Sequence, residues 1–381
     1  MHTVTQNAFP QEPGPPQARA PTSPRRNTAK TPFPALICCA LISSFFLACS
    51  PAGSARDGRQ AVTPSKVIKE DAVLKEIHSF RHETRSWYNA SRFDELEKRA
   101  AALRASKAVF GNGRWKIQRF YDSLECADDE PESMWQLHER IHLDWIAKKP
   151  ASITAQIAYA DFLVSYAWHA RGHEYADKVT PEGWKFFRER LAAAHKVVDE
   201  ARMLPEKDPY LWTIALAVAL GEGPDKTVYD ALVEQAHASE PLFWSYDTAR
   251  AYSLLPRWHG NPGDWERYAA AAASRSDGVG AETYTRIVMF LMGNYGNVFE
   301  ETQASWPKTR EGLAQMLKKY PDSMEVVQFG ALLSSFAGDR TFARQMFDRI
   351  GDTCLISVWG SQKRFDYWRK WASVQRPRKT L

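Results

Sequence analysis

The sequence predicts an all-α fold made of stacked helical hairpins, an α-solenoid. Three observations indicate this class. Residues 321–352 have the pattern of a helix, a tight turn and a second helix. An alanine stands ten residues after each of four prolines that follow expected helix ends. From Ser133 onward the chain shows no convincing run of alternating apolar and polar residues, the pattern typical of strands.

The segment 321–352 carries the clearest helix signals. Pro321 ends one helix, and Asp322 or Ser323 can cap the next. Gly338 is a left-handed stop, and Asp339 caps the second helix. That second helix has apolar residues at three- and four-residue spacing, namely Phe342, Ala343, Met346, Phe347 and Ile350. With small residues at Gly330, Ala331 and Ala343, where two helices can approach closely, this unit resembles a tetratricopeptide repeat.

The same register is expected in three earlier places. The prolines are Pro150, Pro209, Pro241 and Pro321, and the alanines are Ala160, Ala219, Ala251 and Ala331. The spacing of Pro209 and Pro241 is close to the ~34 residues of tetratricopeptide repeats, whereas the other spacings carry insertions. We therefore expect a degenerate tetratricopeptide-like array.

The chain divides into four expected regions: a leader (1–48), a tether rich in small residues (49–65), an N-terminal helical region (66–149) and the repeats (150–381). In the N-terminal region, helices are expected over 66–87 and 93–107, followed by a turn and packed segment at 111–124 that contains Gly111 and Gly113. Further helices are expected at 133–148, 152–171, 181–203, 210–220, 225–238, 243–254, 263–275, 281–295, 309–319, 323–337, 339–350 and 361–374.

The leader contains an apolar run that ends at Cys49. A basic segment, about 16 apolar residues and a small residue predict an export signal. The apolar run is short for a membrane-spanning helix, which needs about 20 residues. The ending Phe46-Leu47-Ala48-Cys49 resembles the bacterial lipoprotein signal, in which the cysteine is lipid-modified. The resemblance implies an envelope protein anchored at Cys49 and facing the periplasm, with Ser50 favouring the outer membrane. An ordinary signal peptide or an uncleaved anchor is the alternative.

Charge and cysteine content limit the partners. The net charge is +5, and residues 1–48 account for +3 of it through four Lys or Arg and one Glu, so a nucleic-acid partner is not expected. Beyond the anchor only Cys126 and Cys354 remain. They are expected to be buried free thiols, although an oxidising compartment would also allow a disulfide between them.

Two phrases point to a family. Ser165–Gly172 (SYAWHARG) and Leu255–Gly260 (LPRWHG) resemble signatures of a bacterial domain family of unknown function, whose members are exported or lipid-anchored and tetratricopeptide-like. The earlier FGNGRWKIQRFY is similar to that family as well, and the resemblance spans roughly residues 80–300. The resemblance implies a tetratricopeptide-like fold and an exported or lipid-anchored protein. The family has no assigned activity, so the resemblance implies none.

One motif matches a metal site. His138-Glu139-Arg140-Ile141-His142 has the form H-E-x-x-H, in which two histidines one turn apart hold zinc and the glutamate activates water. The third ligand is missing nearby, with Glu174 a remote option, so partly buried histidines packed between tryptophans are the other reading. His169 and His173 form a second such pair, interrupted by Gly172.

The densest aromatic group surrounds LPRWHG. Trp258, His259 and Trp265, with Arg257 beside them, are the candidate binding residues, and Trp244, Tyr246 and Tyr268 lie close in sequence. Such rings can stack on sugars or peptides, or can form a hydrophobic clamp between repeats. The basic, aromatic segment Arg364–Lys379 can likewise lie on an anionic membrane or form a terminal capping helix.

These observations predict a lipid-anchored envelope protein that acts as a non-enzymatic scaffold for a protein or peptide partner, without a cofactor. The alternatives are a zinc-dependent hydrolase that uses the HERIH helix, and an aromatic module that binds carbohydrate or peptidoglycan. No Walker loop, dinucleotide glycine pattern or serine-nucleophile elbow occurs in the sequence, so an enzyme is the less favoured class.

Overall fold

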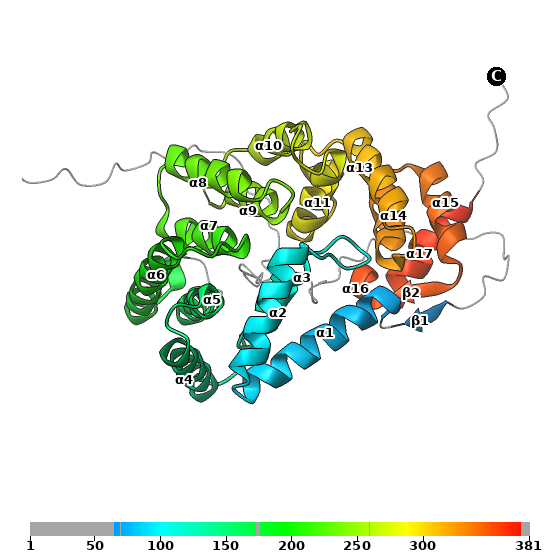
Figure 1. Ribbon diagram of the computed structural model, residues 1–381. Coiled ribbons are helices and arrows are strands. Elements are labelled where there is room, and N and C mark those ends of the chain that lie inside the picture. Colours follow the sequence, from blue (N-terminus) through cyan, green and yellow to red (C-terminus); the bar gives the residue numbers. More distant parts are fainter. Residues whose placement is uncertain (1–64, 69, 173–175, 259, 375–381) are drawn as a thin grey trace, which may run out of the picture. The chain divides into compact units, whose positions relative to one another are not determined.

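The protein is all-α, as predicted (Figure 1). The computed structural model describes residues 65–68, 70–172, 176–258 and 260–374. Of these residues 71% are helical, in 17 α-helices, and the regular strands among them form one two-stranded sheet. All of them belong to one compact unit, so the expected N-terminal region and the expected repeats share a core. No helix in these ranges is both long and apolar enough to cross a membrane.

The helix bounds follow the sequence prediction closely. The first elements are β1 (Lys66–Ile68), α1 (Ala72–Asn89), α2 (Phe93–Ser106), α3 (Lys116–Asp122) and α4 (Glu132–Lys148). The middle of the chain forms α5 (Ile153–Arg171), α6 (Pro181–Arg202), α7 (Tyr210–Glu222), α8 (Lys226–Ser239), α9 (Ser245–Ser253), α10 (Asp264–Ala273), α11 (Ala281–Leu291) and α12 (Val298–Glu301). The last elements are α13 (Trp306–Lys319), α14 (Met324–Phe336), α15 (Arg340–Ile350), β2 (Thr353–Leu355), α16 (Ile356–Trp359) and α17 (Gln362–Ser373).

The α14–α15 hairpin confirms the predicted caps. The Ser323 side chain accepts from the Val326 amide at 3.3 Å and caps α14. Gly338 has a φ of 73°, and the Asp339 carboxylate accepts from the Phe342 amide at 3.0 Å at the start of α15. These local signals are strong because each one satisfies a backbone group that the helix end would otherwise leave without a partner.

The middle helices pack in sequence order. α5 packs on α6, α6 on α7, α7 on α8 and α8 on α9, and a second set of contacts joins α5 to α7, α7 to α9 and α9 to α11. The helices α5, α7, α9 and α11 thus form a continuous row, named here the α5–α11 row. The four alanines that stand ten residues after a proline lie on α5, α7, α9 and α14. They are buried, with exposed fractions of 0–5% (Ala160, Ala219, Ala251 and Ala331).

Two short strands form where a helix or irregular structure was expected. Residues 66–68 were predicted to begin a helix, and instead form β1, which pairs in parallel with β2 at Lys66–Thr353, Val67–Cys354 and Ile68–Leu355. The prediction of helix there was wrong because the pairing strand comes from the other end of the chain and leaves no local signal. Figure 1 shows the two strands side by side.

The segment after Gly111 was also only partly predicted. It was expected to be a turn and a packed segment, and it forms a tight turn followed by the buried helix α3. The turn closes through backbone hydrogen bonds between Phe110 and Arg114 (2.8 Å) and from the Gly113 amide to the Phe110 carbonyl (2.8 Å). We name residues 110–115 the central loop, because helices from three later parts of the chain bind it.

The central loop is held by α9, α11 and α14. Glu325 on α14 accepts from the side chains of Asn112 and Arg114, both at 2.8 Å. Arg286 on α11 donates to the Asn112 carbonyl at 3.0 Å, and the indole of Trp244, the residue before α9, donates to the Gly113 carbonyl at 3.1 Å. The chain continues from this loop into α3, which packs on α1 and α2 and stacks its Tyr121 ring on Tyr210 of α7 at 4.7 Å.

Candidate functional site

The HERIH histidines lie inside an aromatic cluster. His138 and His142 are 5% and 1% exposed on α4. The Tyr88 ring lies 5.3 Å and 5.2 Å from their rings, and Phe162 lies 5.1 Å from His142. The Tyr88 hydroxyl is 3.2 Å from His138 Nδ1, whereas neither ring nitrogen of His142 has a hydrogen-bond partner among the described residues. The cluster is therefore a packing arrangement into which two imidazoles fit as aromatic rings.

A zinc site at these histidines would need at least a third ligand. In the part of the chain that the structure describes, no three His, Cys, Asp or Glu side chains are grouped so that they could hold a metal ion. Glu174, the remote candidate ligand, lies outside the described residues, as does His173 of the second pair. His169 stacks on Trp135 at 4.5 Å, and its Nδ1 is 3.4 Å from Asp128.

The buried histidines predict a loss of stability in acid. Burial lowers the pKa of His138 to about 4 and that of His142 to about 3, with a further contribution from the nearby Arg85 charge. An unfolded histidine has a pKa near 6.5, so below that pH the unfolded chain binds more protons and the free energy of unfolding falls. The stabilisation present above pH ~6.5 is lost by about 1.4 kcal/mol per pH unit per histidine as the pH falls toward the folded values.

Urea unfolding of the native chain and of His142→Phe from pH 7 to pH 5 measures this effect. The phenylalanine variant keeps an aromatic ring and removes one titrating group, so its stability should fall less steeply with acidity. The difference between the two proteins is the informative quantity, because burial also raises the pKa of Asp122 and of Asp208, which contributes with the opposite sign. Equal slopes would contradict the prediction.

The LPRWHG segment places its candidate binding residues in different environments. Trp265 is 1% exposed and belongs to the core, so it offers no ring face to a ligand. Trp258 is partly buried, and Arg257 is exposed and donates to the Tyr252 hydroxyl at 3.1 Å and to Asn294. His259 lies outside the described residues. Of the predicted set, Arg257 and Trp258 remain at a surface.

The two family-like phrases meet at this place. Trp168 of SYAWHARG and Trp258 of LPRWHG contact edge to face, with ring centroids 5.8 Å apart. Arg171 lies over the Trp168 ring at 5.5 Å and over the Trp184 ring at 5.2 Å. The end of α5 and the connection after α9 therefore form one cluster, although almost ninety residues (168 to 258) separate the two tryptophans.

A buried group of carboxylates was not foreseen from the sequence. The Tyr210 hydroxyl lies 3.4 Å from an Asp122 oxygen and 3.2 Å from an Asp161 oxygen. Burial raises the pKa of Asp122, and burial together with repulsion from Asp122 and Asp161 raises the pKa of Glu125 well above its usual range. Perturbed carboxylates often mark active sites. Here Asp122 on α3 and Asp161 on α5 are 1% and 3% exposed. The Tyr210 hydroxyl of α7 lies between their carboxylates and so links the three helices.

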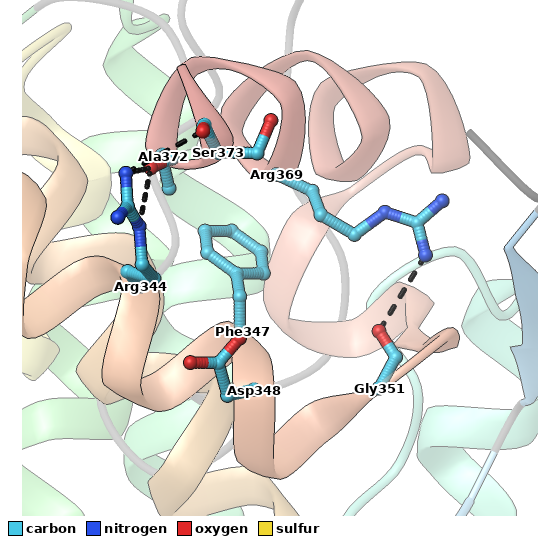
Figure 2. A pocket seen from close by; sticks show the side chains of 7 residues that line it. All are labelled: Arg344, Phe347, Asp348, Gly351, Arg369, Ala372 and Ser373. Carbon is cyan, nitrogen blue, oxygen red and sulfur yellow. Dashed lines mark hydrogen bonds between the residues drawn. The ribbon is translucent and has the colours of Figure 1, made fainter. Parts of the chain in front are cut away.

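A shallow pocket of about 290 Å³ lies between α15 and α17 (Figure 2). Its two arginines bind main-chain carbonyls. Arg344 donates to the Ala372 and Ser373 carbonyls at the end of α17, and Arg369 reaches the Gly351 carbonyl at 3.5 Å. Asp348 also lines the pocket and offsets part of their charge. The two arginines therefore join α17 to α15 and add positive charge to this region.

The two cysteines of the described ranges have the predicted state. Cys126 and Cys354 are buried free thiols, as expected, and burial raises the pKa of each to about 11. Cys49 lies outside the described residues.

Comparison with known proteins finds no match: no family model, no curated protein and no solved structure is similar to this chain at a significant level.

Proposed function

We propose that this chain is a bacterial envelope protein, lipid-anchored at Cys49, that acts as a non-enzymatic scaffold for a protein or peptide partner. The observation that best supports this function is the packing order of the helices. Each helix from α5 to α9 packs on its neighbour in sequence, and alternate helices form the α5–α11 row. This is the contact pattern of tetratricopeptide-like arrays, which present extended surfaces to peptides and proteins.

One end of the α5–α11 row already holds a segment of the chain itself, the central loop. Arg286 on α11 and the indole of Trp244, the residue before α9, donate to the main-chain carbonyls of Asn112 and Gly113 in this tight turn. Since Arg286 and Trp244 are occupied by the chain's own loop, an external partner is proposed to bind elsewhere. The exposed Arg257 beside the Trp168–Trp258 contact is the strongest candidate, because arginine and tryptophan are the residues most often found at the energetic centre of interfaces.

The junction of SYAWHARG and LPRWHG is consistent with the proposed relationship to the exported, tetratricopeptide-like family. Residues that define one structural unit should contact each other in the fold, and Trp168 and Trp258 do so. Gly260 is required in the same unit, because a Cβ atom there would lie 1.8 Å from the Leu254 carbonyl oxygen. No observation favours the zinc-hydrolase or the carbohydrate-binding alternative.

The test is partner capture with the full tagged chain, extracted from the envelope in mild detergent. We expect one or more reproducible partners that are retained by the native chain and lost with Arg257→Glu. Lys196→Glu is the matched control, because Lys196 is 79% exposed on α6 and its loss should leave capture unchanged. The absence of any reproducible partner, together with turnover of a small substrate by the purified chain, would contradict the proposal.

A further inference from the structure

The end of the tether lies against the C-terminal helix. Ser65, the first described residue, accepts from the Gln362 side-chain amide through its carbonyl at 2.8 Å and its hydroxyl at 2.9 Å. The Lys66 amide next to it donates to the Asp352 carbonyl at 2.7 Å. Cys49 is 16 residues before Ser65, so even a fully extended tether places the anchor within about 55 Å of the first turn of α17.

The outward face of α17 is basic and aromatic. Phe365 and Ala372 are 0% and 1% exposed and attach the helix to the core. Lys363, Tyr367 and Lys370 follow at four- and three-residue spacing on the exposed side, and Tyr367 is 53% exposed. Within the described ranges neither lysine forms an ion pair, so both charges face solvent.

Positive charge gathers in the same region. Residues 340–374 contain seven Lys or Arg and three Asp, a net charge of +4, whereas the whole chain carries +5. Arg340 lies over the Trp371 ring at 4.4 Å, and Arg344 and Arg369 line the pocket beside α17 (Figure 2). Lysines with amphipathic rings on one helix face are typical of segments that lie on anionic lipid.

We propose that the face of α17 formed by Lys363, Tyr367 and Lys370 lies on an anionic lipid surface when the chain is anchored at Cys49. The inference rests on the proposed anchor, which brings α17 to the membrane because the tether ends on this helix. A lipid anchor and a basic patch then act together, with the lysines attracted to acidic headgroups and Tyr367 at the interface. The contact would fix which side of the protein faces the membrane.

Lysine footprinting on the unmutated chain tests this contact. The full-length chain, purified from envelopes, is reconstituted into phosphatidylcholine vesicles that contain or lack phosphatidylglycerol. It is then labelled with an amine-reactive ester and analysed by mass spectrometry. We expect the reactivity of Lys363 and Lys370 to fall about threefold or more on the anionic vesicles only, and to recover in high salt. Lys185 and Lys196, whose side chains are 65% and 79% exposed on α6, serve as internal controls and should not change.

Unchanged reactivity of Lys363 and Lys370, or equal protection on both kinds of vesicle, would overturn the proposal. The same labelling is also done on native envelopes. Protection of both lysines there, without protection on anionic vesicles, would overturn the proposal as well and would indicate an acidic protein partner. The mass of the N-terminal peptide reports the anchor separately. An unmodified Cys49 contradicts the proposed anchoring, whereas unprotected lysines on an anchored chain contradict only the contact of α17.

Discussion

Replacing Glu325 by alanine is expected to lower the free energy of unfolding by about 3–5 kcal/mol. Glu325 is 3% exposed and accepts hydrogen bonds from both Asn112 and Arg114, which are 2% and 7% exposed. Burial already lowers the pKa of Arg114 to about 10, opposed by the Glu325 charge. Without the carboxylate, a buried guanidinium loses its counter-charge and a buried amide loses its acceptor, and both losses act on the central loop.

Urea unfolding followed by circular dichroism measures this loss. Asp144→Ala is the matched control, because it removes the acid of an ion pair on α4 whose side chains are 57% and 45% exposed, with Lys148 Nζ 2.8 Å from Asp144. Exposed pairs contribute little, so the control should change stability by no more than about 0.5 kcal/mol. Similar losses in the two variants would show that the Glu325 pair is not a structural link between α14 and the central loop.

The features that sequence alone predicts are those with a local cause. Ser323 and Asp339 cap the helices that they were expected to cap, since each cap binds an amide three residues later. The helix expected over 152–171 is α5, Ile153–Arg171, because a continuous helical pattern ends at Gly172. The helix class and the bounds of the helices with such local signals were predictable for this reason.

The features that sequence missed depend on residues distant along the chain. Asn112 and Glu325 are 213 positions apart, and β1 pairs with a strand near the other terminus. α3 is only seven residues long, and it is stabilised by packing on α1 and α2 and by the stacking of Tyr121 on the distant Tyr210 rather than by its own periodicity. The candidate site was affected in the same way. Exposure distinguishes Arg257 from Trp265, although the two residues stand in one aromatic segment.

Gly113 in the central loop has a packing role beyond that of an ordinary turn residue. Gly113 has a φ of 78°, and a Cβ atom at this position would lie 2.2 Å from Arg286 Nη2 and 2.4 Å from the Tyr320 ring. Both neighbours are themselves fixed. Arg286 pairs with the fully buried Glu282, and the Tyr320 hydroxyl donates to the same carboxylate at 3.0 Å. The loop therefore approaches α11 so closely that only a residue without a side chain fits.

Gly113→Ala is accordingly expected to destabilise the protein by roughly 2–4 kcal/mol, from about 1 kcal/mol of backbone strain and a further 1–3 kcal/mol of overpacking. Gly338→Ala separates these causes. Gly338 has a similar φ of 73°, and a Cβ atom there would meet no heavy atom within 4 Å, so only the strain should remain. Thermal and urea unfolding of both variants measure the difference. Equal losses at the two glycines would mean that the central loop can move away from Arg286 at little cost, and that it does not hold α11 in place.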